Sequence, residues 1–167
     1  MAVSGPDGTE NGGRPHFVLA SASPRMFYLL RQVGLVPDRV LPAFIDETPA
    51  RTELPRPYVR RMAMEKANVV AASLSEPALV LGADTVVALG RRILPKAENR
   101  ETARACLEQL SGRRHTVLTA LSVIPSAGWP EGHRAERVVE TAVTFSRMTS
   151  HPVSYTHLRA HETAANL

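Results

Sequence analysis

Cysteine is nearly absent from this sequence of 167 residues, since Cys106 is the single one. One cysteine cannot build an internal disulfide framework, which favours a reducing compartment. Cys106 shares a helical pattern with Ala103 and Leu110, so a small buried side chain is a better interpretation than a nucleophile. We therefore expect a cytoplasmic protein.

Long hydrophobic runs are also missing. No segment approaches the roughly 20 apolar residues of a membrane helix, and the best candidate, 79–89, contains Asp84. The first fifteen residues are rich in Gly, Asp, Asn and Pro, and they lack the apolar stretch of a secretory signal. We expect residues 1–15 to be a disordered tail of a soluble protein that is not exported.

Aromatic residues make up only 5% of the chain, while 44% is hydrophobic, enough for one compact domain with a core. The net charge of +4 favours an anionic partner, but charge alone does not separate a nucleotide from a polynucleotide, a membrane surface or no partner. The scarcity of aromatic side chains argues against binding of single-stranded nucleic acid, which usually stacks bases on such rings.

The hydrophobic pattern predicts an α/β domain with a mixed twisted sheet flanked by helices. Proline at the first turn supports helices that open at Pro24 and Pro55, and Asn99 is a good N-cap for a third. The predicted helices are 24–33, 55–74 and 100–110. The predicted strands are 17–20, 38–43, 78–82, 86–89, 115–124 and 137–145.

The last residues have a different character. Residues 153–163 resemble the conceptual translation of a transposon-type sequencing adapter, and 164–167 are interpreted as further read-through. We therefore predict that the folded domain covers 16–152 and is incomplete at its C-terminus. His157 and His161 lie four residues apart, like a helical metal-binding pair, and on this interpretation they carry no function.

One candidate site lies where the first strand meets the first helix. Ser21 and Ser23 supply hydroxyl groups there, and Arg25 supplies a guanidinium group. Free N–H groups at a helix N-terminus attract anions, and serine and arginine add donors suited to phosphate oxygens. The alternative is an ordinary capped helix with a surface arginine.

Carboxylates and lysines form the rest of the candidate set. Asp84 is predicted to end a buried strand, where a carboxylate is costly unless it is paired or bound to a metal. The loop pair Asp46-Glu47 suits a hard cation such as Mg²⁺. Lys66 and Lys96 could neutralise a polyphosphate. Each also has a plain alternative: a turn-forming aspartate, solvated loop acids and surface lysines.

In combination these segments resemble the Maf family of nucleoside triphosphate pyrophosphatases. The string Leu19-Ala20-Ser21-Ala22-Ser23-Pro24-Arg25 is similar to the family's opening signature. The other matching segments follow in the family's order: Ile45-Asp46-Glu47, Glu65-Lys66-Ala67, Gly82-Ala83-Asp84-Thr85-Val86-Val87, Ile93-Leu94-Pro95-Lys96, Leu110-Ser111-Gly112-Arg113-Arg114-His115 and Val143-Thr144-Phe145.

The resemblance implies a Maf/ITPase-like fold and hydrolysis of a nucleoside triphosphate to its monophosphate and pyrophosphate. It implies a divalent cation, Mg²⁺ or Mn²⁺, with Asp84 activating water and Glu47 and Asp84 as metal ligands. It also makes Ser21, Arg25, Lys66 and Lys96 substrate ligands, and Thr85 resembles the subgroup that prefers dTTP and UTP. Homodimers are common in the family, although the sequence pattern gives no independent support for one.

The sequence departs from the family pattern at three places. Met26 replaces a usual second arginine, Ala97 replaces a usual proline, and a later Lys-Ala-Gly-x-Tyr-x-Ile-Gln-Gly segment is absent. We therefore expect the 167-residue chain to be poorly active and marginally stable. Two alternatives remain open: an inactive truncated homologue, and a basic module that binds a nucleotide or nucleic acid without catalysis.

Overall fold

The structure is a computed structural model that describes residues 14–148. Its elements follow in the order β1 (His16–Ala20), α1 (Pro24–Gln32), β2 (Arg39–Val40), α2 (Pro55–Ala72), β3 (Ala78–Leu89), β4 (Arg92–Ile93), α3 (Arg100–Leu110), β5 (Arg114–Pro125) and β6 (Ala135–Thr144). Within residues 14–148, every helix is too short or too polar to cross a bilayer. The predicted tails, 1–15 and 153–167, lie wholly or mostly outside the described residues.

The strands form one mixed sheet with the order β2-β1-β3-β5-β6. β1 pairs in parallel with β2 and β3, whereas β5 is antiparallel to both β3 and β6. The short β4 returns antiparallel to the end of β3. The α/β class and the mixed sheet flanked by helices, as predicted from the sequence, are therefore confirmed.

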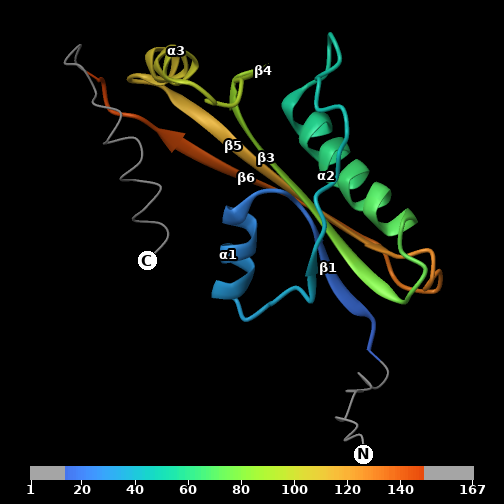
Figure 1. Cartoon of the computed structure of the whole chain (residues 1–167). Helices are drawn as coiled ribbons and strands as arrows, with labels where there is room; N and C mark the ends of the chain where they lie inside the picture. The colour runs from blue at the N-terminus through green and yellow to red at the C-terminus, as the bar shows by residue number, and fades with distance from the viewer. Residues whose placement is uncertain (1–13, 149–167) are drawn as a thin grey trace, which may run out of the picture.

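The two faces of the sheet carry different helices (Figure 1). Alternate residues of a strand point to opposite faces. Val18 and Ala20 of β1 accordingly pack in a core cluster with α2, whereas Leu19 packs with Leu30 of α1. The third helix, α3, lies at the far end of the sheet, where Cys106 and Leu110 pack with Leu94. Cys106 is thus a buried packing residue, as the sequence pattern indicated.

Helix boundaries follow the predicted signals closely. α1 and α2 begin at Pro24 and Pro55, where the missing proline N–H costs no intrahelical bond. Asn99 caps α3, since its side chain accepts a hydrogen bond of 2.8 Å from the Thr102 amide. Gly34 follows α1 with a φ of 76°, a left-handed conformation that glycine adopts without strain.

Two strand predictions were wrong. The predicted strand 38–43 is reduced to Arg39–Val40. The predicted break at Asp84 does not exist, because β3 runs without interruption from Ala78 to Leu89 and Asp84 lies inside it. The reason is β5, which pairs with β3 from Leu79 to Ala88 and keeps the backbone extended where the pairing with β1 stops.

Gly82 decides how closely α2 can approach the sheet. A Cβ atom at this position would lie 2.1 Å from the Ala63 carbonyl oxygen and 2.9 Å from the Ala67 Cβ. Both alanines are fully buried on α2. The small residues on both sides therefore let the helix backbone contact β3, and this close packing brings Lys66, which precedes Ala67, next to the strand.

Candidate active site

The candidate site lies at a gap in the pairing of β3. β1 pairs with β3 up to Gly82, and β4 pairs with it from Ala88 onward. Within the described part of the chain, residues 83–86 therefore pair with β5 on one edge and have no strand partner on the edge that β1 and β4 occupy on either side of the gap. Asp84 and Thr85 lie within this gap. Ligands of open α/β sheets bind beyond strand ends where the chain order reverses, and this gap is such a place.

Lys66 bridges two carboxylates at the gap. Its Nζ lies 2.7 Å from Asp84 Oδ1 and 2.8 Å from Glu47 Oε1. Lys66 and Asp84 are both buried, with 9% and 7% of their surface exposed. Burial alone would lower the pKa of Lys66, but the hydrogen bonds to Asp84 and Glu47 outweigh it and raise that pKa above its ordinary value. Lys66 therefore stays charged at neutral pH.

Glu47 joins this pair to a second lysine. Its other carboxylate oxygen is bonded by Lys96, so one carboxylate contacts two ammonium groups. Partial burial raises the pKa of Glu47, but the hydrogen bonds from Lys66 and Lys96 together lower it below its ordinary value. The neighbouring Asp46 is not part of this cluster, since its Oδ1 accepts a hydrogen bond from the Thr48 amide at 2.9 Å and shapes the loop.

Asp84 retains an unused acceptor. Oδ1 is bonded to Lys66, whereas Oδ2 is buried and has no hydrogen-bond partner among the described residues. Leaving a buried carboxylate oxygen without a donor costs free energy. Such an orphaned group in a polar cluster is typical of a site that is completed by a ligand.

Ser21 and Arg25 lie at the same end of the sheet but outside the lysine–carboxylate cluster. Ser21 follows Ala20, the last residue that pairs with β3, and its Oγ accepts a hydrogen bond of 3.1 Å from the Ser23 amide. Ser21 is buried, and Arg25 is exposed on the first turn of α1. Within residues 14–148, the N-cap Ser23 makes no side-chain capping bond, so the first amides of α1 are not used by that hydroxyl.

Thr85 points to the other face of β3 from Asp84. It is exposed, and its hydroxyl lies 3.0 Å from that of Thr119 on β5. The sequence places Thr85 next to Asp84, but strand alternation separates the two side chains. The structure therefore brings together Glu47, Lys66, Asp84 and Lys96, and it places Ser21, Arg25 and Thr85 around them rather than among them.

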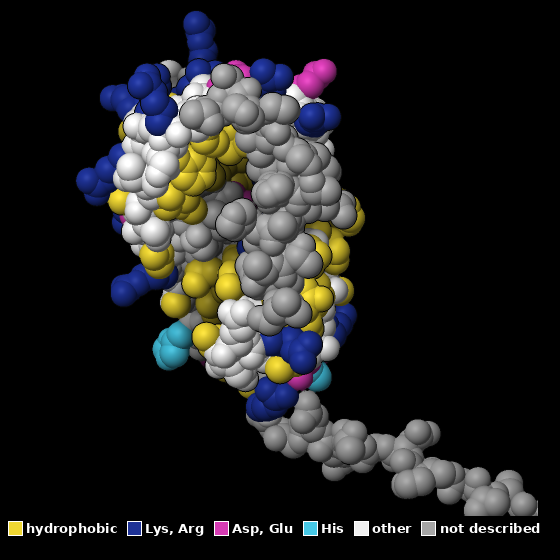
Figure 2. Space-filling view, turned by 90° about the vertical axis from the view of Figure 1, so that its left-hand side faces the viewer, with side chains coloured by type: hydrophobic (Ala, Val, Ile, Leu, Met, Phe, Trp, Pro, Cys, Tyr) yellow, Lys and Arg dark blue, Asp and Glu magenta, His cyan; other side chains and the backbone are white. Residues whose placement is uncertain are grey.

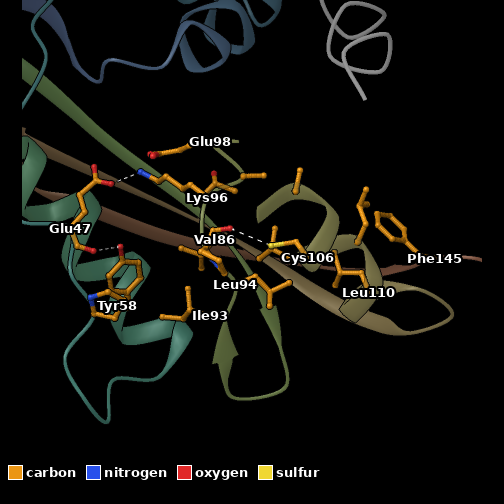
Figure 3. A pocket seen from close by; sticks show the side chains of 17 residues that line it. Glu47, Tyr58, Val86, Ile93, Leu94, Lys96, Glu98, Cys106, Leu110 and Phe145 are labelled. Carbon is orange, nitrogen blue, oxygen red and sulfur yellow. Dashed lines mark hydrogen bonds and ion pairs between the residues drawn. The ribbon is translucent and has the colours of Figure 1, made fainter. Parts of the chain in front are cut away.

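A cavity of about 590 Å³ opens beside this cluster, between the 47–58 region and α3. Glu47, Tyr58 and Lys96 line one end, and Cys106 and Phe145 line the other (Figure 3). In Figure 2, hydrophobic side chains gather on one side of a hollow, and Lys and Arg side chains lie toward the edge of the molecule. An apolar cavity with a few charged groups at one end is the usual form of a small-molecule site.

Few of the described side chains are available to bind a metal ion at this site. Among residues 14–148, no three His, Cys, Asp or Glu side chains come together as a metal-binding group. Glu47 and Asp84 nevertheless face one cation, the Lys66 ammonium, at 2.8 and 2.7 Å. Two carboxylates suit Mg²⁺, which usually takes one or two from the protein and completes its shell with substrate phosphates and water.

Comparison with known proteins places this arrangement in a family. The family model for Maf-like protein matches residues 16–163. The chain belongs to the Maf family. It is 62% identical over 136 residues to a dTTP/UTP pyrophosphatase of Gluconobacter oxydans, covering 81% of this chain and 62% of that protein. It is 56% identical over 135 residues to one of Caulobacter vibrioides, covering 81% of this chain and 67% of that protein.

The chain thus spans about two thirds of the length of these curated Maf relatives. Among solved structures, a HAM1 protein from Coxiella burnetii is similar, with a TM-score of 0.49 and 17% identity over 76% of this chain and 72% of that chain.

Two of the three departures from the Maf pattern, Met26 and Ala97, lie in described parts of the fold. Met26 packs against the core cluster of Leu19, Leu30 and Leu81, so this position serves α1 packing in this chain. Ala97 lies in the loop that lines the cavity beside Lys96. The absent Lys-Ala-Gly segment has no counterpart in residues 14–148.

Sequence reasoning missed Tyr58, which contacts the site directly. Its hydroxyl donates a hydrogen bond of 2.7 Å to the Glu47 main-chain oxygen. Burial raises the pKa of Tyr58, and the Asp84 and Glu47 carboxylates add to the effect, so the hydroxyl remains a donor. A signal was present in the sequence: Tyr58, Met62 and Lys66 are spaced by four, which puts them on one helix face.

Proposed function

We propose that this protein hydrolyses nucleoside triphosphates, dTTP and UTP in particular, to the monophosphate and pyrophosphate. The observation that carries the proposal is the cluster of Lys66 between Asp84 and Glu47 at the gap in β3. Membership of the Maf family and the names of its relatives supply the substrate class. Thr85, which follows Asp84, agrees with the dTTP/UTP subgroup that the sequence resembles.

The reaction adds one water molecule across the bond between the α- and β-phosphates. The water oxygen bonds to the α-phosphorus, the bridging bond breaks, and pyrophosphate leaves. Asp84 is proposed as the base, because its unpartnered Oδ2 can accept the proton that the water loses. A base must lie within hydrogen-bond reach of that water. Within residues 14–148, the stretch 83–86 has no strand partner on the edge away from β5, and substrate would approach Asp84 from this edge.

The remaining residues hold the substrate. Lys66 and Lys96 would exchange their bonds to Glu47 for bonds to phosphate oxygens, which carry developing negative charge. Ser21 and Arg25, at the start of α1, would bind a further phosphate group, aided by the first amides of that helix. On this proposal, the residues packed near α2 bind the reacting phosphates, and the residues at the start of α1 position the nucleotide.

A divalent cation, Mg²⁺ or Mn²⁺, belongs to the proposal. Glu47 and Asp84 would hold it, because both already face one positive charge in this structure. When bound, the cation neutralises phosphate charge and orients the substrate.

We further propose a cytoplasmic location and a nucleotide rather than a nucleic acid as partner. A single buried cysteine supports the former, and the 5% aromatic content supports the latter. Self-association as a homodimer, which is common in the family, is a separate expectation that sedimentation velocity would test.

The test is release of pyrophosphate from dTTP, UTP and 7-methyl-GTP, with and without Mg²⁺. We expect metal-dependent release, fastest from dTTP or UTP. Asp84→Asn removes the base and should lower kcat at least about 1000-fold, near the upper end for general base catalysis. Glu108→Gln is the matched control, since Glu108 is an exposed carboxylate on α3 paired only locally with Arg104.

Binding of nucleotide without turnover, unchanged by Asp84→Asn, would instead favour the binding-module interpretation. Absence of both binding and turnover would favour the inactive homologue.

A further inference from the structure

Tyr58 forms a hydrogen bond with the backbone of the loop that carries Glu47. Its hydroxyl donates to the Glu47 main-chain oxygen at 2.7 Å, and the residue, 5% exposed, packs in the core cluster with Val59, Met62 and Val86. A side chain packed in this way has little rotamer freedom, so the hydroxyl position is set by the core. The bond therefore ties the loop to a side chain that is packed in the core.

Lys66 forms an ion pair with the side chain of Glu47. Tyr58 and Lys66 both belong to α2 and are eight residues apart, which places them two turns along one face. Tyr58 holds the main-chain oxygen of Glu47, whereas Lys66 contacts the carboxylate at 2.8 Å. Two contacts from one helix therefore fix both the position and the direction of this side chain. Figure 3 shows the first of them, between Tyr58 and Glu47.

Arg61 secures the loop one residue further along. Its Nη2 donates to the Thr48 main-chain oxygen at 3.3 Å, and its guanidinium carbon lies 5.6 Å above the centre of the Tyr58 ring. The same guanidinium group forms two bonds with Glu53, at 2.7 and 2.8 Å. The loop 47–53 is thus held at its beginning and at its end by adjacent turns of α2.

We propose that Tyr58 is a positioning residue for Glu47, and that its hydroxyl holds the Glu47 carboxylate where Lys66, Lys96 and a divalent cation meet it. This inference rests on the proposed function for its catalytic consequence, but the positioning itself does not. The Tyr58 hydroxyl is bonded to the main chain of the loop, so its effect on the Glu47 carboxylate is transmitted through the loop.

The first experiment measures hydrogen–deuterium exchange of the 167-residue chain and two variants. Tyr58→Phe removes only the hydroxyl and keeps the buried ring. We expect amides of residues 47–53 to exchange about fivefold faster, in line with the loss of one ordinary hydrogen bond, while β3 and β5 keep the wild-type rate. Tyr28→Phe is the control, because Tyr28 lies exposed on α1. It should leave both regions unchanged.

The second experiment separates positioning from general damage. The Mg²⁺ concentration for half-maximal pyrophosphate release should rise about fivefold in Tyr58→Phe, with kcat restored at saturating Mg²⁺ and KM for the nucleotide unchanged. Equal exchange in the two variants, or faster exchange spread evenly over β3 and β5, would overturn the proposal. If the wild-type chain releases no pyrophosphate, the proposed function fails, and the exchange result alone decides the role of Tyr58.

Discussion

The two sides of the sheet differ in how they hold their candidate site residues. On the α2 side, Lys66 and Asp84 are buried and bonded to each other. On the α1 side, Arg25 is exposed on a nine-residue helix in which Leu30 is the one buried residue, while Leu29 and Val33 face solvent. The charges proposed to act on the reacting phosphates are therefore organised before substrate binds, whereas Arg25, which is proposed to bind a further phosphate, lies exposed on the first turn of α1.

The difference follows from packing. α2 spans 18 residues and contributes to two core clusters, and Gly82 lets it contact the strand backbone. α1 contributes to one smaller cluster with Leu19 and Leu81. A buried charged pair needs fixed partners, because a small displacement would leave an unpaired charge in a region of low dielectric constant. The closely packed helix is the element that can provide them.

Loss of Lys66 should have the largest effect on stability. Lys66→Met keeps the length of the side chain but leaves Asp84 and Glu47 facing each other without their shared cation. We expect the free energy of unfolding to fall by about 3 kcal/mol, the lower end for breaking a buried ion pair, since Glu47 is partly exposed. Urea denaturation followed by circular dichroism measures it.

Lys96→Met is the matched control for that substitution. It removes the other lysine bonded to Glu47, but the Lys96 side chain is 57% exposed. We expect a loss of less than about 0.5 kcal/mol, as for other surface pairs. Equal losses in the two lysine variants would show that the burial of Lys66 does not distinguish the α2 side.

Gly82→Ala should cause the second largest loss of stability, because it forces α2 away from β3. The added methyl would lie 2.1 Å from the Ala63 carbonyl oxygen, which is backbone and cannot rotate away. We expect a loss of about 2 kcal/mol, within the range for overpacked cores, together with a longer distance from Lys66 to Asp84. Thermal unfolding measures the first, and a crystal structure of the variant measures the second. A variant as stable as wild type would mean that the close approach of α2 is not required.

Much of this arrangement was predictable from local sequence signals. Pro24, Pro55 and Asn99 fix helix starts through backbone chemistry that acts within one turn, so these positions were correct. The continuity of β3 was not predictable, because it depends on pairing with β5, whose partner residues lie 28 to 46 positions further along the chain. A valine-rich segment interrupted by Asp84 has the same local pattern as two short strands.

The site shows the same division between local and distant causes. The motifs identified Lys66, Asp84 and Glu47 individually, and the structure joins them through distances of 2.7 and 2.8 Å. The separation of Thr85 from Asp84 follows from strand alternation, which applies here because β3 continues through both residues. Tyr58 was missed because its role depends on a main-chain oxygen, and a sequence motif contains no record of such a contact.

The smallest effect is expected where α2 holds the end of the loop. Arg61 bonds both carboxylate oxygens of Glu53, and these hydrogen bonds lower the pKa of Glu53 below its ordinary value despite partial desolvation. A lowered folded-state pKa gives stability that is present above the unfolded value of about 4.3 and is lost as the pH falls through the folded value. Glu53→Gln should therefore cost about 0.5 kcal/mol at pH 7, a value discounted for solvent screening.

That cost should disappear in acid, because wild-type Glu53 then becomes protonated and loses the same charge. Melting temperatures of wild type and Glu53→Gln, measured from pH 7 down to about pH 3, should converge at the acid end. Lys66 differs from Glu53, since its raised pKa places its own titration above this range and the lysine stays charged throughout it. A difference in melting temperature that stayed constant down to pH 3 would assign the effect of Glu53 to the shape of the loop. The α2 side would then hold the loop through packing and neutral hydrogen bonds, with Tyr58 as its main contact.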